Sequence, residues 1–233
     1  MRGVVFLGER ELEIRDFPDP SPGPEEVVLE IRASGMCGSD LKFYRPRGGA
    51  AALGLVSDGS PVIAGHEPCG VVVEVGSDVS SKTAQVGRRV MVHHYLGCGD
   101  CTHCLSGWSQ LCLHGVTVYG VTGHGSHAQY MKVAASTLVS LPEELSFSTG
   151  AAISCGTGTA FGALRRIGLC SDDTIVIFGQ GPVGLSATQI ATAMNARVIA
   201  LDISPERLAR AEEFGAEEIL EPSKDDAVKP SET

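Results

Sequence analysis

Four cysteines crowd into a short stretch near the middle of the chain, and their spacing is typical of a metal site. They are Cys98, Cys101, Cys104 and Cys112. Four thiolates on a glycine-bearing loop can surround one ion, and a closed tetrahedral set of sulfur ligands is typical of structural zinc. An iron–sulfur cluster of the bacterial ferredoxin type is less favoured, because Leu113, rather than proline, follows the last cysteine and the last gap is too long. We therefore predict a structural zinc site.

A second pattern combines a histidine, an acid and spaced glycines in the order Gly65-His66-Glu67-x2-Gly70-x5-Gly76. Taken alone, His66 and Glu67 are explained equally well as a surface histidine and a solvated acid. The regular spacing of the glycines makes a chance occurrence less plausible. The pattern is therefore treated as a motif rather than as a coincidence.

A third pattern is a glycine-rich turn that follows an apolar run and opens a helical segment. Its residues are Gly179, Gly181, Pro182, Val183 and Gly184. Glycines at this spacing let the backbone approach a pyrophosphate, whose charge is stabilised by the helix N-terminus. Asp202 ends the next apolar run, where a carboxylate binds ribose hydroxyls and repels a 2′-phosphate, so NAD is favoured over NADP. Arg207 could pair with a 2′-phosphate, but a solvated helix face is the preferred interpretation.

Composition excludes several classes of protein. The 233 residues include 43% apolar and 20% charged residues, as expected of a globular protein, and eight cysteines without the small size of a secreted disulfide scaffold. The net charge of -10 argues against nucleic acid and anionic membranes as partners. No apolar run approaches a membrane span, and the first residues meet charge too early for a signal peptide. We expect a cytoplasmic protein.

The pattern of apolar and small residues divides the chain into two parts. We predict a β-rich domain over residues 1–150, with strands at 27–31, 70–75 and 89–92, and a second domain over 151–233. The second domain begins with a helical segment interrupted at Gly156 and Gly158.

The second domain then alternates strand and helix. Strands are predicted at 174–178, 197–201 and 218–220, with a helix over 184–196 and another that opens at Ser204 and closes at Gly215. The first strand is a continuous apolar run, as expected of a strand buried on both faces. This order is the first half of a doubly wound parallel sheet, which needs about six strands when complete.

The three patterns together resemble the zinc-containing medium-chain alcohol dehydrogenase family, up to about residue 221. The resemblance implies an α/β protein in which a GroES-like, β-barrel-type catalytic domain precedes the first half of a Rossmann domain. It implies two zinc ions per chain and NAD as cofactor. In the catalytic site it implies Cys37, His66 and Cys155 as zinc ligands, a set that leaves an open coordination position and is typical of alcohol dehydrogenases.

The resemblance also assigns roles to neighbouring residues. Asp40 is similar to the carboxylate that orients the imidazole of the histidine ligand. Ser39 is similar to the hydroxyl that takes the proton of the alcohol, and Thr159 to the residue that packs near the nicotinamide. Glu67 is either a temporary zinc ligand or a residue outside the ligand shell. Cys69 and Cys170 are interpreted as small buried hydrophobic residues.

Two departures from the family pattern affect the functional hypothesis. The outer proton acceptor of many relatives is a histidine, and Lys42 stands at that position. The chain also stops short of a full cofactor domain and of the return to the catalytic domain, so we expect a C-terminal truncation.

The functional hypothesis is hydride transfer between a secondary alcohol or polyol and NAD, with a small alcohol or carbonyl compound as the partner and with homo-oligomers possible. The alternative is a truncated zinc-binding remnant without turnover. A zinc-free quinone reductase is disfavoured, because Cys37, Cys155 and the four clustered cysteines are all present.

Overall fold

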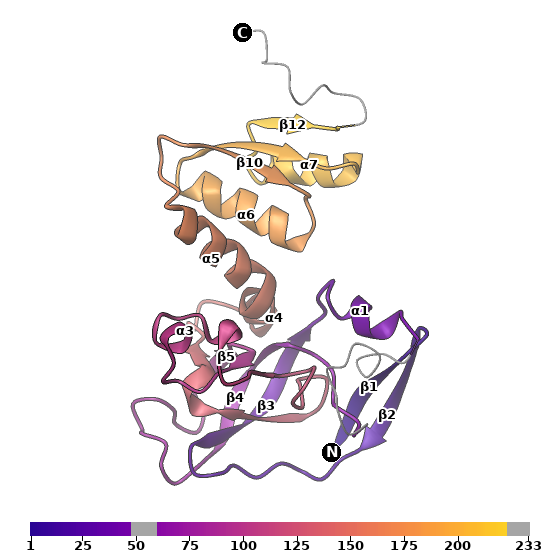
Figure 1. Ribbon diagram of the computed structural model, residues 1–233, viewed down its shortest axis with the longest axis vertical. Coiled ribbons are helices and arrows are strands. Elements are labelled where there is room, and N and C mark those ends of the chain that lie inside the picture. Colours follow the sequence, from indigo (N-terminus) through magenta and orange to yellow (C-terminus); the bar gives the residue numbers. More distant parts are fainter. Residues whose placement is uncertain (48–59, 223–233) are drawn as a thin grey trace. The chain divides into compact units, whose positions relative to one another are not determined.

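The computed structural model describes residues 1–47 and 60–222 (Figure 1). They fall into two units, Met1–Cys155 and Gly156–Thr233, called unit 1 and unit 2 below. The sequence places a boundary between functional domains at residue 150. That boundary stays a prediction.

Unit 1 is built on a five-stranded antiparallel sheet in the order β8-β3-β4-β5-β9. The strands are β3 (Glu26–Gly35), β4 (Glu67–Val75), β5 (Arg89–Val92), β8 (Tyr130–Ala134) and β9 (Leu138–Ser140). The three strands predicted in this region are confirmed, although β3 and β4 are longer than the apolar runs that indicated them.

The core of unit 1 lies against this sheet. Val27 and Leu29 of β3 and Val72 of β4 are fully buried in one cluster, together with Val133 of β8. A smaller cluster holds Cys69, Met91, Leu141 and Ala151, the last of which belongs to a helix. Because Cys69 is fully buried there, its interpretation as a small core residue is confirmed. The same interpretation is wrong for Cys170, which is exposed.

Shorter elements surround the sheet of unit 1. A hairpin is formed by β1 (Arg2–Gly8) and β2 (Glu11–Asp16), and a two-stranded ribbon by β6 (Tyr95–Leu96) and β7 (Thr117–Val118). The short helices are α1 (Leu41–Tyr44), α3 (Thr102–Leu105), η1 (Ser109–Leu111) and η2 (Ala135–Thr137). Two of them, α3 and η1, lie within the four-cysteine segment and shape its loop.

The small-residue segment after Ser146 differs from its prediction. We expected a helix interrupted at Gly156 and Gly158, but helical structure continues through α4 (Phe147–Ala152), a π-helical turn η3 (Ile153–Thr157) and α5 (Gly158–Ile167). The wider π turn accommodates its glycine without ending the helix, and such turns are frequent at functional sites. It contains Cys155.

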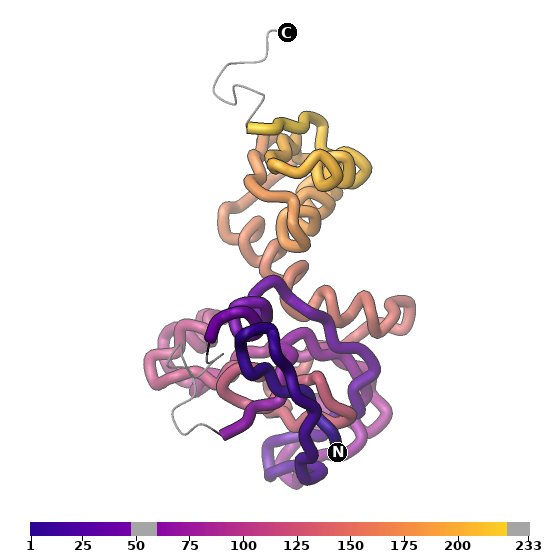
Figure 2. Tube along the Cα trace, turned by 90° about the vertical axis from the view of Figure 1, so that its right-hand side faces the viewer, coloured from indigo at the N-terminus to yellow at the C-terminus, as the bar shows by residue number. Residues whose placement is uncertain are grey.

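Unit 2 contains the predicted parallel sheet, in the order β10-β11-β12. Its strands are β10 (Thr174–Phe178), β11 (Arg197–Leu201) and β12 (Glu218–Leu220), and the connecting helices are α6 (Pro182–Ala193) and α7 (Pro205–Glu213). Figures 1 and 2 show this alternation along the orange and yellow part of the chain. The Ser204 hydroxyl caps α7 by accepting from the Arg207 amide, so the predicted helix start is confirmed.

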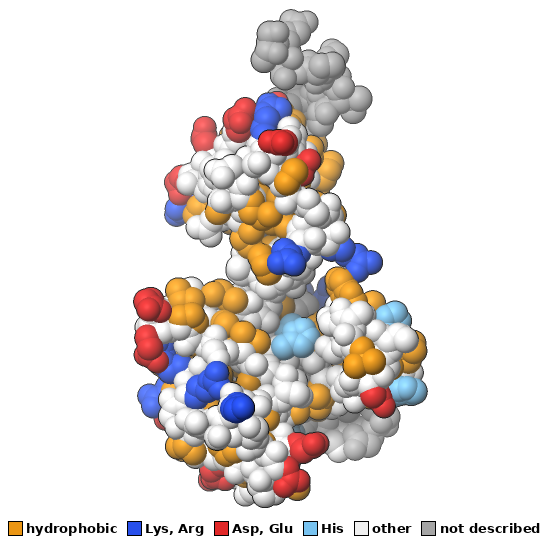
Figure 3. Space-filling model, turned by 90° about the vertical axis from the view of Figure 1, so that its left-hand side faces the viewer, with side chains coloured by type: hydrophobic (Ala, Val, Ile, Leu, Met, Phe, Trp, Pro, Cys, Tyr) orange, Lys and Arg blue, Asp and Glu red, His pale blue; other side chains and the backbone are white. Residues whose placement is uncertain are grey.

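The prediction that β10 is buried on both faces is wrong for the described residues. Ile177 is 8% exposed, whereas Val176 is 44% and Phe178 79% exposed. The crossovers from β10 to β11 and from β11 to β12 run in the same direction across the sheet. Because such crossovers are right-handed, α6 and α7 lie on the same face of the sheet. On the face of the molecule drawn in Figure 3, hydrophobic side chains (orange) are scattered among basic (blue) and acidic (red) side chains.

The sheet core gives a first testable prediction. Leu29→Ala should lower the free energy of unfolding of unit 1 by about 2–5 kcal/mol, because it leaves a cavity among fully buried side chains. Leu12→Ala is the matched control, since Leu12 is 52% exposed, and should change it by less than about 0.5 kcal/mol. Urea unfolding followed by circular dichroism measures both, and equal losses would contradict the assigned core.

Candidate metal and dinucleotide sites

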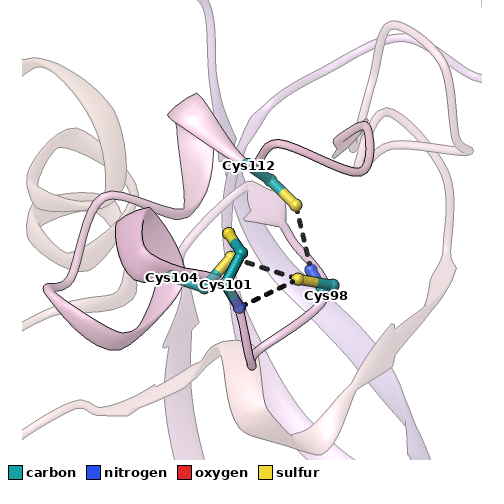
Figure 4. A group of neighbouring side chains, drawn as sticks. All are labelled: Cys98, Cys101, Cys104 and Cys112. Carbon is teal, nitrogen blue, oxygen red and sulfur yellow. Dashed lines mark hydrogen bonds between the residues drawn. The ribbon is translucent and has the colours of Figure 1, made fainter.

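The four clustered cysteines converge on one point. Their sulfur atoms all lie within 4.8 Å of one another, and the sulfurs of Cys98 and Cys104 are 3.9 Å apart. Figure 4 shows the four side chains close together, with dashed lines from Cys98 to each of the other three cysteines. Trp108, just before η1, accepts a hydrogen bond from the Leu111 amide at 2.8 Å and so helps to close the loop.

Residues 98–114 are called the lobe below. Backbone amides of the lobe donate hydrogen bonds to its sulfur atoms. The Cys101 amide donates to the Cys98 sulfur at 3.4 Å, and the Cys98 amide to the Cys112 sulfur at 3.3 Å. The amides of Leu113 and Cys104 lower the pKa of Cys101 to about 6. Because thiolates are the form that binds metal, these donors favour metal binding at Cys101. The carboxyl of Asp100 acts in the opposite sense and raises the pKa of Cys98 to about 12.

A second group of metal-ligating atoms lies elsewhere in unit 1. One ligand atom each from Cys37, His66, Glu67 and Cys155 lies within 4.8 Å of the others. Cys37 follows β3, His66 directly precedes β4, and Cys155 comes from the π turn. The Cys37 and Cys155 sulfurs are 3.9 Å apart, although 118 residues separate them along the chain. The structure thus brings together all three predicted catalytic ligands and Glu67.

The carboxylate of Asp40 lies against the imidazole of His66. The His66 Nδ1 is 2.9 Å from Asp40 Oδ1, and the Asp40 side chain is fully buried. The other oxygen of Asp40 accepts a hydrogen bond from the Cys37 amide at 2.8 Å. Burial alone would lower the pKa of His66, but the bonds to Asp40 and to the two cysteine sulfurs raise it to about 11 in the metal-free state.

Ser39 and Glu67 complete the surroundings of His66. The Ser39 hydroxyl lies 3.1 Å from His66 Nε2, the ring nitrogen that faces away from Asp40. Glu67 is 8% exposed, and its burial raises the pKa of its carboxyl. Gly65, with a φ of +94°, makes the turn before His66, and a side chain there would collide with the His127 ring.

His94 and Tyr95 were missed by the sequence analysis. The His94 ring lies 5.0 Å from the His66 ring and 4.2 Å from the Tyr95 ring, measured between centroids. His94 is 6% exposed, and burial lowers its pKa to about 4, so it is an uncharged imidazole beside the ligand group. The pair of histidines between β5 and the lobe was the available signal, but only the folded chain shows that one of them reaches His66.

In unit 2 the glycine-rich turn has the geometry expected of a phosphate loop. It connects β10 to α6, with Gly181 at the N-cap and Pro182 and Val183 in the first turn of the helix. Gly179 has a φ of +85°, and a side chain at Gly184 would collide with the carbonyl oxygen of Gly179.

Asp202 lies beside this turn at the end of β11. Its oxygens accept hydrogen bonds from the Gln180 amide at 2.6 Å and from the Ser204 amide at 2.9 Å. These donors lower the pKa of Asp202, although its burial opposes the shift. Gln180, which no sequence pattern singled out, is buried beside this turn. Its side-chain amide donates to the Ile177 carbonyl and accepts from the Thr188 hydroxyl.

A pocket of about 260 Å³ opens beside Asp202. It is lined by Phe178, Gly179, Leu201, Asp202, Ile203, Arg207 and Pro222. The Arg207 side chain is 58% exposed, in agreement with a solvated position, but its guanidinium also lies 3.6 Å from Asp202. Thr159 lies in α5 of unit 2, and its role near a nicotinamide stays a prediction.

Comparison with known proteins identifies the family. Residues 23–143 match the family model described as the alcohol dehydrogenase GroES-like domain, and residues 182–232 match the zinc-binding dehydrogenase model. The chain therefore belongs to the zinc-containing medium-chain dehydrogenases, with a GroES-like domain followed by the start of a Rossmann-like domain.

Relatives of known sequence include several dehydrogenases. The chain is 36% identical to the uncharacterized zinc-type alcohol dehydrogenase-like protein YphC of Escherichia coli K12, with 92% of this chain and 61% of that protein covered. It is 35% identical to an alcohol dehydrogenase of Geobacillus stearothermophilus, with 97% and 65% covered. It is 33% identical to the sorbitol dehydrogenase of Bacillus subtilis, with 100% and 64% covered. The chain thus spans less than two thirds of the length of these relatives.

Solved structures agree with this assignment. Galactitol-1-phosphate dehydrogenase from Escherichia coli superposes with a TM-score of 0.85 at 30% identity, covering 97% of this chain and 62% of that one. The alcohol dehydrogenase rspB from Escherichia coli CFT073, solved with NADH, gives 0.85 at 29% identity, with 96% and 63% covered. Among the described residues of this chain, no helix is long and apolar enough to cross a membrane.

The buried Asp40–His66 pair gives a second prediction. Asp40→Asn should weaken zinc binding at the group of Cys37, His66 and Cys155 by about 10–100-fold, because the imidazole loses the carboxylate that orients it. The control is Asp16→Asn, which removes a charge from an exposed position on β2. Competition with a chromophoric chelator measures both affinities, and an unchanged affinity in Asp40→Asn would contradict the orienting role.

Proposed function

We propose that this chain carries the zinc and NAD sites of an alcohol dehydrogenase that transfers a hydride between a secondary alcohol or polyol and NAD. The observation that carries the proposal is the convergence of Cys37, His66 and Cys155 in a partly exposed group. Two sulfurs and one imidazole leave one position of a tetrahedral zinc free for substrate. The four-cysteine lobe, by contrast, would fill all four positions and serve stability.

The donor set fits zinc in both groups. Sulfur and imidazole are its usual protein ligands, and the Asp40 contact at Nδ1 leaves the Nε2 of His66 for the metal. Zinc bound there supplies a Lewis acid that lowers the pKa of an alcohol hydroxyl. Glu67 adds a carboxylate oxygen within the same group, which supports a role in exchanging ligands or in shaping the site.

Ser39 is the residue best placed to handle the proton of the alcohol. Its hydroxyl is 3.1 Å from the ligand nitrogen of His66 and belongs to the same turn as Cys37 and Asp40. From there it can accept a proton and donate its own to solvent. Lys42, whose amide donates to the Ser39 carbonyl at 2.9 Å, is partly exposed.

The features around Asp202 support NAD as the cofactor. NAD supplies the hydride acceptor, and the chain supplies the turn and the carboxylate that hold it. The two amides that bind Asp202 keep it ionised, and a fixed negative charge at this point disfavours a 2′-phosphate. Arg207 partly offsets this charge. A reducing compartment such as the cytoplasm would keep the thiols of both metal groups free.

Zinc content tests both metal groups. After exhaustive dialysis the chain should retain two zinc ions. Cys104→Ser and Cys37→Ser should each lower the content to about one, because each removes a ligand from a different group. Cys170→Ser is the control, since Cys170 is an exposed thiol outside both groups, and should leave the content at two. A content near one in the unaltered protein, unaffected by Cys37→Ser, would contradict the catalytic site.

Formation of NADH tests the reaction. The zinc-loaded chain is incubated with NAD or NADP and with a panel of primary alcohols, secondary alcohols and polyols, and absorbance of the reduced cofactor is followed. We expect turnover of secondary alcohols or polyols with NAD, and loss of it in Cys37→Ser. A preference for NADP would contradict the cofactor assignment. Absence of both turnover and thermal stabilisation by NAD would favour the zinc-binding remnant.

A further inference from the structure

A further cluster of metal-ligating side chains lies on the surface of the lobe. One ligand atom each of Cys98, Asp100 and His114 lies within 4.8 Å of the other two, and all three residues are exposed. The cluster shares Cys98 with the four-cysteine group, but that group is already complete with four sulfurs. Asp100 and His114 therefore have no part in the function proposed above.

The charge around this cluster favours a cation. Four thiolates around one divalent ion leave a net charge of minus two. Asp100 adds a further negative charge beside Cys98. The lobe contains no Lys or Arg between Cys98 and His114 that could balance these charges.

The geometry of the cluster suits the same class of metal. Sulfur, carboxylate oxygen and imidazole nitrogen are the protein ligands of zinc, at about 2.0–2.3 Å from the ion. Two ligands of a tetrahedral ion at these distances are about 3.3–3.8 Å apart, and the ligand atoms of the three residues already lie within 4.8 Å of one another. Small rotations of the exposed Asp100 and His114 side chains would close the difference. The backbone at His114 is anchored, because its amide donates to the Cys112 sulfur.

We propose that Cys98, Asp100 and His114 form an additional, weaker site for a divalent cation of the zinc class. A sulfur atom keeps lone pairs after it binds one metal, so Cys98 bridges the two ions. Asp100 and His114 supply the other protein ligands, and water occupies the remaining position, which makes the ion exchangeable. The inference rests on the proposed function in one respect, since the four-cysteine group must hold its own metal.

Zinc titration of the full chain tests the site. The protein is first dialysed so that only tightly bound zinc remains, and this content is measured. Calorimetric titration with zinc should then show one additional equivalent in the unaltered protein. His114→Ala and Asp100→Asn should lose that equivalent while keeping the tightly bound zinc, which shows that the lobe is intact. His103→Ala is the matched control, because His103 lies in the lobe outside the cluster, and should keep it.

Two outcomes of the titration would overturn the inference: no additional equivalent in the unaltered protein, or the same additional binding in His114→Ala and His103→Ala. A shortage of tightly bound zinc in the unaltered protein would instead count against the proposed function. Replacement of zinc by cadmium-113 tests the bridge separately. Scalar coupling between two cadmium signals, lost in His114→Ala, is expected if Cys98 binds both ions, and an uncoupled additional signal would contradict the shared sulfur.

Discussion

The antiparallel pairing of β3 with β4 is the constraint on which the group of Cys37, His66, Glu67 and Cys155 depends. Gly35 at the end of β3 pairs with Glu67 at the start of β4, so the segments carrying Cys37 and His66 leave the sheet at the same end. Two register shifts in this pair adjust the strands before they reach the site, as bulges near active sites often do. A side chain at Gly35 would collide with the Glu67 carboxylate, so the close pairing needs glycine there.

Sequence reasoning succeeded where the signal was local. Ligand spacing in the lobe, the apolar runs of unit 2 and the cap at Ser204 are each contained in a few consecutive residues, and the folded chain agrees with them. It failed where the arrangement depends on contacts between segments that are distant in the sequence. The approach of His94 to His66 depends on how two strands pack, and the exposure of Phe178 depends on which face the helices cover. The site roles of Ser39 and Thr159 are carried by resemblance and remain predictions.

The two metal groups prepare their ligands for an ion in different ways. In the lobe, backbone amides surround the sulfurs, so the loop itself supplies partial positive charge and little side-chain chemistry is needed. In the second group a buried carboxylate acts on an imidazole, which makes the ligand more basic and fixes its ring. The first arrangement suits a permanent ion in a surface loop. The second suits an ion whose remaining position changes partner during a reaction.

The place of Trp108 has a consequence for observing the molecule. It is the only tryptophan of the chain, and it lies between Cys104 and Cys112 next to the turn that closes the lobe. Intrinsic tryptophan fluorescence of this protein therefore originates from one small loop. Filling or emptying the four sulfurs changes the loop that carries this indole. The chain thus carries a built-in optical reporter for the state of its lobe, without any label.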